Sequence, residues 1–539
     1  MEALSAQGAC TPARPTGGGG CGALVFIGFM GAGKSTAARA IANDRGTRAL
    51  DSDRELEARL GEPIEAYFDR EGEAAFRARE QEVVLELLDR GGGGVLALGG
   101  GAPGSEAVRE ALHAHTVVHL EVEPAEAWRR ASGKGRPLAR ERGRFDQLHA
   151  DRSALYESLA DATLPAGDRG TARAALPALL ALEQARSAAA GPVRLVWART
   201  TSGDYPVYFG AGLLAGGFVW PPDGRRFAIT DVNVAAHHRL RDAEHTIAVE
   251  AGEQAKTLAS AEDALRGLAR AGAERSDVVV AVGGGVVGDL AGFCAAVYQR
   301  GMRHVQVPST LVAQVDSAYG GKTGVDLPEG KNYAGAYHQP SAVICDPALL
   351  GTLPAPELAA GYAEVVKTAL IAGGPLWARV RGGGALRGDP SGPTAREDEQ
   401  TILGCLRTKL AVVAADERDA GARQVLNLGH TVGHAIESAT GYARYRHGEA
   451  VGIGLLAALR LSGRDALRGE VADLLAARGL PLAFEGATVE QVAELCARDK
   501  KRSGGRLPLV LVAAPGEVTH GHEVPPASLH DAIAEICAA

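Results

Sequence analysis

Short apolar runs alternate with longer amphipathic stretches in the first third of the chain. Ala23–Ile27 leads into a glycine-rich segment, after which Ser35–Asn43 has the apolar spacing of a helix. Further apolar runs occur at Val95–Leu98 and Thr116–Val122, and Glu73–Leu88 has helical spacing. Strands that alternate with helices predict a parallel sheet covered by helices.

The same alternation returns after Val193 on a larger scale. From about Pro356 onward the apolar spacing is three and four, which predicts a region made mostly of helices. Gly382–Pro393 is rich in glycine and proline and is predicted to be a loop. The predicted strands of this second region are Arg226–Thr230, Thr246–Glu250, Val278–Val282, His304–Pro308 and Ala342–Asp346.

A chain of 539 residues is too long for one hydrophobic core, so several domains are expected. The first residues are rich in Gly, Ala, Pro and Thr without an apolar core, which does not fit a signal peptide. The predicted parts are a loose leader (1–20), a first α/β domain (21–182), a linker (183–192), a second α/β domain (193–355) and a helical domain (356–539).

The composition favours an enzyme of small molecules. Charged residues make up 23% of the chain and the net charge is -8, without a basic patch suited to nucleic acid. No apolar run approaches the ~20 residues of a membrane span. The seven cysteines include no CxxC pair, which favours a reducing compartment, so we expect a cytoplasmic protein without nucleic-acid or membrane partners.

The first apolar run leads directly into Gly28-Phe-Met-Gly-Ala-Gly-Lys34-Ser35, a GxxxxGK[ST] motif between a strand and a helix. This context predicts nucleotide phosphate binding, with Lys34 at the β- and γ-phosphate oxygens and the Ser35 hydroxyl on Mg²⁺. The predicted ATP-binding residues of the loop are Gly31, Ala32, Gly33, Lys34, Ser35 and Thr36.

The phosphate acceptor is indicated only by residues on the C-terminal side of this loop. Asp51 and Asp53 are two apart on a segment expected to be extended, so one carboxylate can reach the metal and the other the acceptor. Basic residues and a glycine run come next, and each of them alone is equally typical of a solvated helix surface or a turn. They are Arg77, Gly99–Gly101, Arg136 and Arg152.

In order and spacing these motifs resemble shikimate kinase, from Cys21 to Leu182. The resemblance implies that Asp53 orients and deprotonates the acceptor hydroxyl and that Asp51 acts on Mg²⁺ through water. It implies that Arg136 comes from a mobile lid around Ser132–Gly135, contributes to catalysis with Lys34 and Asp53, and binds shikimate, and that Arg130 stacks on adenine. The implied ligands of the shikimate carboxylate are Arg77, Arg152, Gly99, Gly100 and Gly101.

Three histidines lie close together in the last third of the chain. His430 and His434 are four apart on an expected helix, and His447 follows in His447-Gly-Glu449. One carboxylate and two imidazoles with an open fourth position form a catalytic zinc site, and Glu364 is the natural carboxylate. The alternative is that one or more of these histidines is a structural hydrogen-bonding group.

A glycine turn precedes this cluster. Val278–Val282 runs into Gly283-Gly-Gly-Val-Val-Gly-Asp289, where a pyrophosphate can approach the backbone, although the spacing alone is a weak dinucleotide signal. Basic and polar residues accumulate further along the chain. They are Arg300, Lys322, Lys331, Asn332, Lys409, Arg423, Asn427, Lys500 and Lys501, and each could also be solvated surface.

From Val193 to the C-terminus the chain resembles 3-dehydroquinate synthase. The matching segments are Gly283–Phe293, Gly320–Gly324, Gly330–Asn332, Gly361–Lys367, Asn427–Glu437 and Asp499–Lys501. The resemblance implies a P-loop kinase-type domain followed by a Rossmann-like NAD-binding domain and a helical metal-binding domain. It also implies a homodimer through this half, with Arg300 supplied by a neighbouring subunit.

The implied reaction is a redox-neutral cyclisation of 3-deoxy-D-arabino-heptulosonate 7-phosphate that consumes and regenerates NAD. Zn²⁺ or Co²⁺ would be held by Glu364, His430 and His447, with Lys322, His434 and Lys367 as catalytic groups. The implied NAD-binding residues are Asp231, Glu253, Lys256, Gly284, Gly285, Val286, Asp289, Thr310, Asp316, Lys322 and Lys331. The implied substrate-binding residues are Arg300, Lys322, Asn332, Lys367, Lys409, Arg423, Asn427, His434, Lys500 and Lys501.

Other functions remain open from the sequence. Sugar phosphate cyclases with other substrates and metal-dependent glycerol dehydrogenases share this fold and metal set, although a dehydrogenase has no need of the phosphate-binding residues. One half could also be a non-catalytic binding module. The two implied activities belong to one route to aromatic amino acids but are not consecutive steps, so matched expression is the simplest reason for the fusion.

Overall fold

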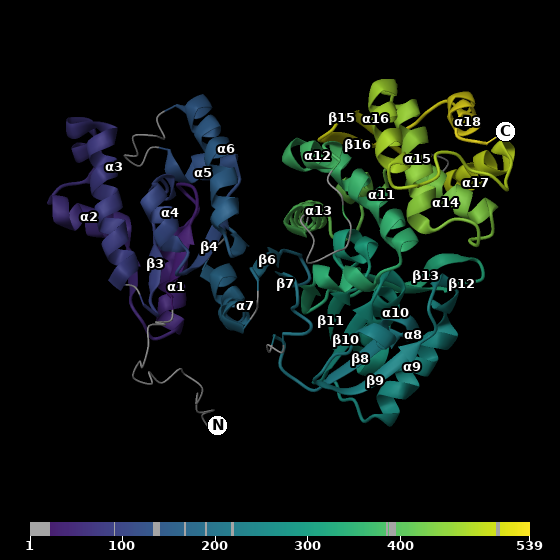
Figure 1. The fold of residues 1–539 in the computed structure, drawn as a ribbon, viewed down its shortest axis with the longest axis horizontal. Helices are drawn as coiled ribbons and strands as arrows, with labels where there is room; N and C mark the ends of the chain where they lie inside the picture. The colour runs from purple at the N-terminus through teal and green to yellow at the C-terminus, as the bar shows by residue number, and fades with distance from the viewer. Residues whose placement is uncertain are drawn as a thin grey trace. The chain divides into compact units, whose positions relative to one another are not determined.

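The computed structural model describes residues 22–90, 92–132, 141–166, 169–188, 191–216, 220–383, 386, 395–502 and 507–538. The chain divides into two compact units, Met1–Leu176 and Pro177–Ala539, and we describe each by itself (Figure 1). The predicted leader, the lid residue Arg136 and most of the predicted loop 382–393 lie outside the described residues.

The first unit is built on a parallel sheet with the strand order β2-β3-β1-β4-β5. Its central strands β1 and β3 are buried along their whole length, as expected for a parallel sheet covered by helices. The strands are β1 (Leu24–Ile27), β2 (Ala49–Asp51), β3 (Val95–Ala97), β4 (Thr116–Glu121) and β5 (Ala162–Pro165). The helices are α1 (Lys34–Asp44), α2 (Ser52–Leu60), α3 (Ile64–Arg90), η1 (Ala102–Gly104), α4 (Glu106–Leu112), α5 (Pro124–Ala131), α6 (Arg142–Leu159) and α7 (Arg169–Ala188).

Helix α7 contains the point at which the two units divide. Its last turns extend into residues 183–188, which the sequence assigns to a linker. The domain limits read from the sequence therefore remain predictions.

The second unit contains a sheet with the order β6-β7-β14-β11-β10-β8-β9, in which only the β6–β7 pair is antiparallel. Its strands are β6 (Arg194–Ala198), β7 (Tyr205–Phe209), β8 (Arg226–Asp231), β9 (Ala243–Val249), β10 (Val278–Gly283), β11 (Arg303–Pro308) and β14 (Ala342–Cys345). Its helices are α8 (Val232–His237), η3 (Glu253–Ala255), α9 (Leu258–Arg270), α10 (Gly285–Val297), η4 (Tyr298–Arg300), η5 (Ala313–Ser317) and η6 (Pro347–Thr352). All five strands predicted for this region are present.

The rest of the second unit is mostly helical, as predicted (Figure 1). Its helices are α11 (Ala355–Ala372), α12 (Gly374–Arg381), α13 (Ala395–Ala415), η7 (Ala422–Asn427), α14 (His430–Ala439), α15 (His447–Leu461), α16 (Asp465–Ala476), α17 (Val489–Arg502) and α18 (Pro526–Ala534). The fold class, a P-loop kinase-type α/β unit followed by a Rossmann-like α/β region and a helical region, is confirmed.

Two antiparallel hairpins were not predicted. They are β12 (Lys322–Leu327) with β13 (Gly330–Tyr337), and β15 (Leu509–Ala514) with β16 (Glu517–His522). The first carries Gly324 and Gly335 opposite each other, and a Cβ on either would press on the backbone of the other strand. Glycine-rich strands give no alternating hydrophobic pattern, which is why the sequence did not indicate the first hairpin.

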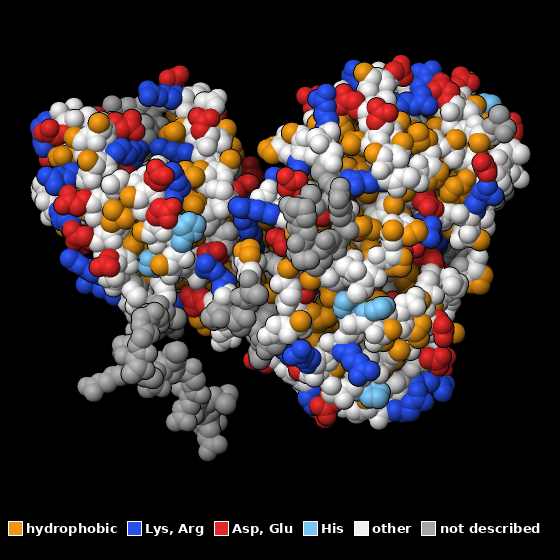
Figure 2. Space-filling model, in the orientation of Figure 1, with side chains coloured by type: hydrophobic (Ala, Val, Ile, Leu, Met, Phe, Trp, Pro, Cys, Tyr) orange, Lys and Arg blue, Asp and Glu red, His pale blue; other side chains and the backbone are white. Residues whose placement is uncertain are grey.

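The surface of the molecule carries both signs of charge. On the face drawn in Figure 2, acidic and basic side chains are interspersed over the described parts. Among the helices that the structure describes, none is long and apolar enough to cross a membrane.

Candidate active sites

The phosphate loop connects the buried strand β1 to helix α1. Gly28, Gly31 and Gly33 have φ angles of 140°, 85° and 89°, which favour glycine. Helix α1 begins at Lys34, so its unpaired N–H groups point towards the loop. The Lys34 ammonium donates to the carbonyls of Gly28 at 2.9 Å and Phe29 at 3.2 Å and therefore lies over the loop. This arrangement forms an anion site at a helix N-terminus.

The prediction that Asp51 and Asp53 share an extended segment holds for Asp51 but is wrong for Asp53. Strand β2 ends at Asp51, which caps α2 by accepting a hydrogen bond from the backbone N–H of Arg54 at 3.3 Å. Aspartate commonly starts a helix in this way, and the helix places Asp53 in its first turn. Ser52 Oγ accepts a hydrogen bond from the N–H of Gly99 at 2.8 Å, so the start of α2 lies against the glycine run.

The glycine run also contacts both predicted arginines. A Cβ on Gly99 would lie 2.6 Å from Asp53 Oδ1, and one on Gly101 would overlap the guanidinium of Arg77. Arg152 Nη1 donates to the carbonyl of Gly100 at 3.4 Å. The structure therefore brings together the side chains at the glycine run that the sequence assigns to the acceptor site, and Arg136 lies outside the described residues.

Arg77 is oriented by a residue that the sequence did not single out. Glu80 is almost fully buried, and its Oε2 lies 2.5 Å from Arg77 Nη1. Burial alone would lower the pKa of Arg77, but the Glu80 carboxylate raises it above its ordinary value. Arg77 therefore carries a full positive charge towards the glycine run.

Arg130 lies beside the phosphate loop at the end of α5. Its Nη1 donates to the carbonyl of Gly31 at 3.3 Å, and its Nε lies 2.5 Å from Glu126 Oε1. The other predicted ATP-binding residues, Ala32, Gly33, Ser35 and Thr36, belong to the loop and the first turn of α1.

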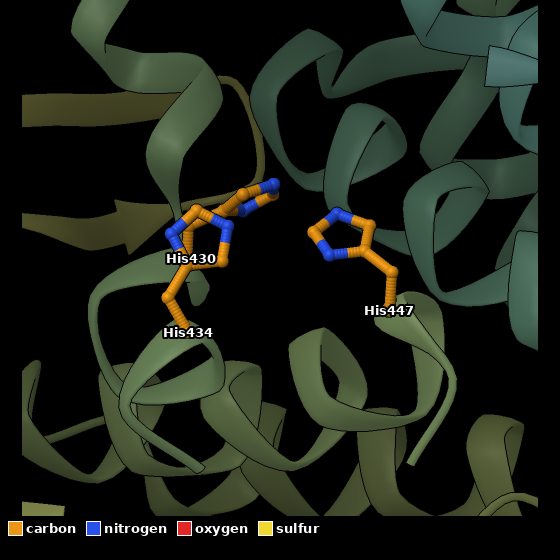
Figure 3. Close-up of side chains that lie close together, drawn as sticks. All are labelled: His430, His434 and His447. Atoms are coloured by element: carbon orange, nitrogen blue, oxygen red, sulfur yellow. The ribbon is translucent and has the colours of Figure 1, made fainter. Parts of the chain in front are cut away.

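In the second unit, three helices bring four potential metal ligands together. The ligand nitrogens of His430, His434 and His447 lie within 4.8 Å of one another, and Figure 3 shows the three rings converging. Glu364 Oε1, on α11, lies 3.6 Å from His430 Nε2 and 3.4 Å from His447 Nε2. The carboxylate and imidazoles form the donor set of a catalytic zinc site, so a divalent cation fits here.

Glycines allow these helices to approach so closely. A Cβ on Gly448 of α15 would overlap the carbonyl of Ala360 on α11, and one on Gly454 would overlap the carbonyl of Gly429 before α14. Because α15 begins at His447, this contact places the imidazole beside Glu364. The sequence showed these glycines but not the contacts that require them.

Two buried lysines balance the carboxylates of the cluster. Lys367 Nζ lies 2.5 Å from Glu364 Oε2 and 3.3 Å from Asp316 Oδ2, and Lys409 forms an ion pair with Asp316. Glu364 and Lys367 are both fully buried. Burial would raise the pKa of Glu364, but Lys367, together with His430 and His447, holds it well below its ordinary value. Asp316, which the sequence assigned to NAD, thus lies among the predicted substrate-binding lysines.

The imidazoles differ in protonation. Burial lowers the pKa of His430 to about 3, so this imidazole is neutral. Burial also acts to lower the pKa of His447, but hydrogen bonds to Glu364 and Glu437 outweigh it and raise this pKa to about 10. Metal binding therefore has to release a proton from His447.

The glycine turn lies at the carboxyl ends of adjacent parallel strands. A Cβ on Gly284 would lie 2.8 Å from Thr310 Cγ2, and one on Gly285 would lie 3.1 Å from Ser317 Oγ. Asp231 ends the neighbouring strand β8 and caps α8. Helix α10 begins at Gly285, with Val286 in its first turn, and a helix N-terminus at this position suits a pyrophosphate.

The other residues predicted to bind NAD surround Lys256. The Lys256 ammonium lies 3.1 Å from Glu253 Oε1 and 3.3 Å from Asp289 Oδ2, and donates to Asn332 Oδ1 at 2.8 Å. Burial raises the pKa of Asp289 to about 6. Asn332, which the sequence assigned to the substrate, is thus in contact with the predicted NAD-binding residues.

The predicted phosphate-binding residues are placed less uniformly. Lys322 is half-exposed and paired with Asp419, whereas Arg423 is buried and donates to the carbonyls of Gly320 at 3.1 Å and Glu417 at 2.6 Å. Asn427 ends η7 and His434 is exposed on α14. Arg300 is exposed in η4, and the side chains of Lys500 and Lys501 on α17 lie outside the described residues.

Three acidic residues beside these sites were missed as functional candidates. Glu437 could have been found, because it lies seven residues after His430 and shares a helix face with it. Glu80 is three residues after Arg77, which is also a helical neighbour distance. Asp419 lies in a loop, and no local pattern connects it to Lys322.

The described geometry defines a phosphate-loop α/β unit joined to a Rossmann-like unit with a helical metal-binding region. A shikimate kinase family model matches residues 30–182, and the N-terminal and C-terminal models of 3-dehydroquinate synthase match residues 246–360 and 361–502. The chain belongs to the 3-dehydroquinate synthase family, with a shikimate kinase region preceding it.

Curated relatives agree with this assignment. The 3-dehydroquinate synthase of Halorhodospira halophila is 41% identical over 358 residues, which cover 64% of this chain and 99% of the relative. That of Symbiobacterium thermophilum is 44% identical over 345 residues, covering 60% and 95%.

Solved structures share the fold of the second unit. A 2-epi-5-epi-valiolone synthase from Streptomyces hygroscopicus, with NAD+ and Zn2+ bound, has a TM-score of 0.56 and 26% identity over 63% of this chain and 98% of that chain. A 2-deoxy-scyllo-inosose synthase complexed with carbaglucose-6-phosphate, NAD+ and Co2+ has the same TM-score and 24% identity over 63% and 99%.

Proposed function

We propose that the chain is a bifunctional enzyme of aromatic amino acid biosynthesis. Its first unit phosphorylates shikimate to shikimate 3-phosphate with ATP, and its second converts 3-deoxy-D-arabino-heptulosonate 7-phosphate to 3-dehydroquinate and phosphate. The identity of 41–44% to 3-dehydroquinate synthases, against 24–26% to the structurally similar cyclases, favours this substrate over other sugar phosphates. We place the enzyme in the cytoplasm.

In the kinase unit, the side chains at the glycine run bind shikimate. Arg77 and Arg152 hold its carboxylate, and Asp53 accepts the proton of the hydroxyl that attacks the γ-phosphate. Lys34, released from the carbonyls of Gly28 and Phe29, neutralises charge on the transferred phosphoryl group. Mg²⁺, bound with ATP, is held by Ser35 directly and by Asp51 through water. Arg136 as the lid residue remains a prediction.

In the synthase unit, Glu364, His430 and His447 hold Zn²⁺ or Co²⁺, and the glycine turn with the residues around Lys256 holds NAD. The metal supplies a positive charge that binds the substrate hydroxyls, and NAD supplies a reversible hydride acceptor. Lys367 and Lys409, both anchored on Asp316, bind the carboxylate and hydroxyls of the substrate.

The substrate phosphate binds to a separate set of residues in this unit. Phosphate binding to Lys322 requires exchange of its Asp419 partner for the ligand. The proposed phosphate ligands are Lys322, Arg423, Asn427, His434, Lys500 and Lys501. A glycerol dehydrogenase does not need a phosphate site, so this set of residues favours a sugar phosphate as the substrate.

The observation that supports the synthase assignment most directly is the buried carboxylate of Glu364, which lies 3.6 Å from His430 Nε2 and 3.4 Å from His447 Nε2. The test uses the purified full chain with a zinc-selective chelator and excess Mg²⁺. Phosphate release from the heptulosonate phosphate should stop and return with Zn²⁺ or Co²⁺, while shikimate-dependent ADP formation continues.

Two variants serve as matched controls in the same assays. Lys34→Met should lose only ADP formation, and Glu364→Gln only phosphate release. Phosphate release that survives both the chelator and Glu364→Gln would contradict the assignment of the metal site.

We further propose that the protein is a homodimer through the synthase unit, with Arg300 reaching the substrate of the neighbouring subunit. The exposure of Arg300 in η4 supports this, and Gln299 and Arg300 have positive φ angles of 47° and 67°. Light scattering should give about twice 55.6 kDa. A monomer that is active as a synthase would exclude the dimer.

A further inference from the structure

Glu437 is a buried carboxylate that no step of the proposed reaction uses. It lies on α14 on the same face as His430, with its side chain 3% exposed. Its Oε2 lies 3.2 Å from His447 Nδ1, and its Oε1 accepts a hydrogen bond from Lys331 Nζ at 3.2 Å. Each carboxylate oxygen therefore serves a different proposed cofactor site.

On its other side, Lys331 reaches the residues proposed to bind NAD. Its Nζ lies 3.5 Å from Glu253 Oε1 and 4.6 Å from the centre of the Tyr442 ring. Glu253 in turn lies 3.1 Å from Lys256. Polar contacts thus run without interruption from His447 through Glu437, Lys331 and Glu253 to Lys256.

The contact with Glu437 determines which nitrogen of His447 can bind a metal. An imidazole has two nitrogens, and a carboxylate at Nδ1 holds the proton there and leaves the lone pair of Nε2 for the cation. Nε2 is the nitrogen that faces Glu364, at 3.4 Å. Glu437 therefore orients the ring towards the other ligands.

We propose that Glu437 is a positioning residue that couples the metal site to the dinucleotide site. NAD that binds against Lys331 and Glu253 holds the Lys331 side chain in place. Lys331 then holds the Glu437 carboxylate, and Glu437 holds the orientation of the His447 ring. This inference rests on the proposed function, since it requires both cofactors. Coupling between two binding sites is reciprocal, so NAD tightens metal binding and the metal tightens NAD binding by the same factor.

The test measures metal affinity directly. The metal-free full chain competes for Zn²⁺ with a chromogenic chelator, with and without saturating NAD. We expect NAD to tighten zinc binding of the wild type by at least about 5-fold, the lower end of typical coupling. The Glu437→Gln side chain has the same shape, but it has one oxygen and cannot accept hydrogen bonds from both His447 and Lys331. This variant should weaken zinc binding by about 10- to 100-fold and abolish the effect of NAD.

Two further variants separate coupling from general damage. Lys331→Met leaves Glu437 on His447, so it should keep zinc affinity near the wild-type value but lose the effect of NAD. Glu449→Gln changes a carboxylate two residues from His447 that does not contact this ring. Glu449 caps α15 by accepting a hydrogen bond from the backbone N–H of Arg446, and glutamine can accept the same bond. It should behave as the wild type. Visible spectra of the Co²⁺-loaded chain provide an independent readout, in which NAD should alter the wild-type spectrum but not those of Glu437→Gln and Lys331→Met.

Each outcome either supports or overturns the proposed coupling. Wild-type zinc affinity that does not respond to NAD overturns the coupling, and so does a response that persists in Lys331→Met, even if Glu437→Gln does not fold. Zinc affinity that is unchanged in Glu437→Gln overturns the positioning role. A wild-type chain that binds neither Zn²⁺ nor Co²⁺ would instead overturn the proposed metal site itself.

Discussion

The two active sites handle charge in opposite ways. In the kinase unit, Lys34 is partly exposed, and its ammonium lies on the backbone carbonyls of the phosphate loop. In the synthase unit, Lys367 is fully buried between the carboxylates of Glu364 and Asp316. One site is an open cradle of N–H groups for a highly charged ligand, and the other is an ion-pair cluster inside the protein.

This difference predicts which of the two units depends on its active-site charges for stability. A partly solvated lysine can lose its charge without leaving a buried partner unbalanced. Removing one member of a buried cluster leaves the others uncompensated, which costs far more than a solvent-exposed ion pair is worth. We therefore expect the synthase unit, and not the kinase unit, to be destabilised by changes in its active site.

The largest effect is expected for Lys367→Met in the metal-free protein. Glu364 and Asp316 would lose their shared cation, and the free energy of unfolding of the synthase unit should fall by about 3–5 kcal/mol. Calorimetry that resolves the transitions of the two units should show only one of them shifted. Zn²⁺ should restore part of the loss, because it replaces a positive charge beside Glu364.

An exposed ion pair of the kinase unit provides the matched control. Arg59 lies 3.1 Å from Glu86, and the two side chains are 32% and 39% exposed. Arg59→Met should change stability by less than about 1 kcal/mol. Equal losses in Arg59→Met and Lys367→Met would contradict the contrast between the two units.

Lys34→Met tests the opposite behaviour in the kinase unit. Its kcat for shikimate-dependent ADP formation should fall by about 10²- to 10³-fold, since a preorganised charge at the transferred phosphoryl group is lost. Its unfolding transition should stay within the error of the wild type, and phosphate release by the synthase unit should not change. A clear loss of stability would show that the lysine also supports the fold.

A smaller effect than those of Lys367→Met and Lys34→Met concerns pH and His304 of the synthase unit. Its ring is buried, stacks on His338 at 4.9 Å between ring centres, and has both nitrogens without a hydrogen-bond partner among the described residues. Burial lowers its pKa to about 3, below the ordinary value of 6.5. Between pH 3 and 6.5 the unfolded chain therefore binds more protons than the folded chain. The contribution of His304 to the free energy of unfolding is fully present above pH 6.5 and is lost as the pH decreases.

From pH 6.5 to 5.5 this histidine alone should remove about 1 kcal/mol from the stability of the synthase unit. His304→Phe, which keeps a ring at the position, should remove that part of the pH dependence in denaturant titrations at several pH values. An unchanged pH profile in the variant would show that other groups control it.

Some of this molecule could be read from local sequence patterns alone. The phosphate loop was predictable because its glycines, Lys34 and Ser35 all lie within the short segment Gly28–Ser35, and the strand before it is a continuous apolar run. The helical spacing of His430 and His434 was equally direct. Asp53 was misplaced because a helix cap and an extended strand end look alike over three residues.

The contacts of some predicted site residues depend on distant partners. Asp316, assigned to NAD, lies between Lys367 and Lys409, and Asn332, assigned to the substrate, accepts a hydrogen bond from Lys256, so both assignments stay predictions. Nothing near these residues in the chain indicates their partners, which are between 51 and 93 positions away.

Residue types and short spacings are enough to predict the two classes of chemistry, the alternation of strands and helices, and the histidine pair His430 and His434. These patterns lie within one strand, loop or helix, so the sequence carries them without help from distant residues. Long-range packing was needed to establish which carboxylate faces which cation and that Glu437 connects His447 with Lys331. The close packing of three glycine-bearing helices buries these charges, and burial is what forces each of them to find a partner.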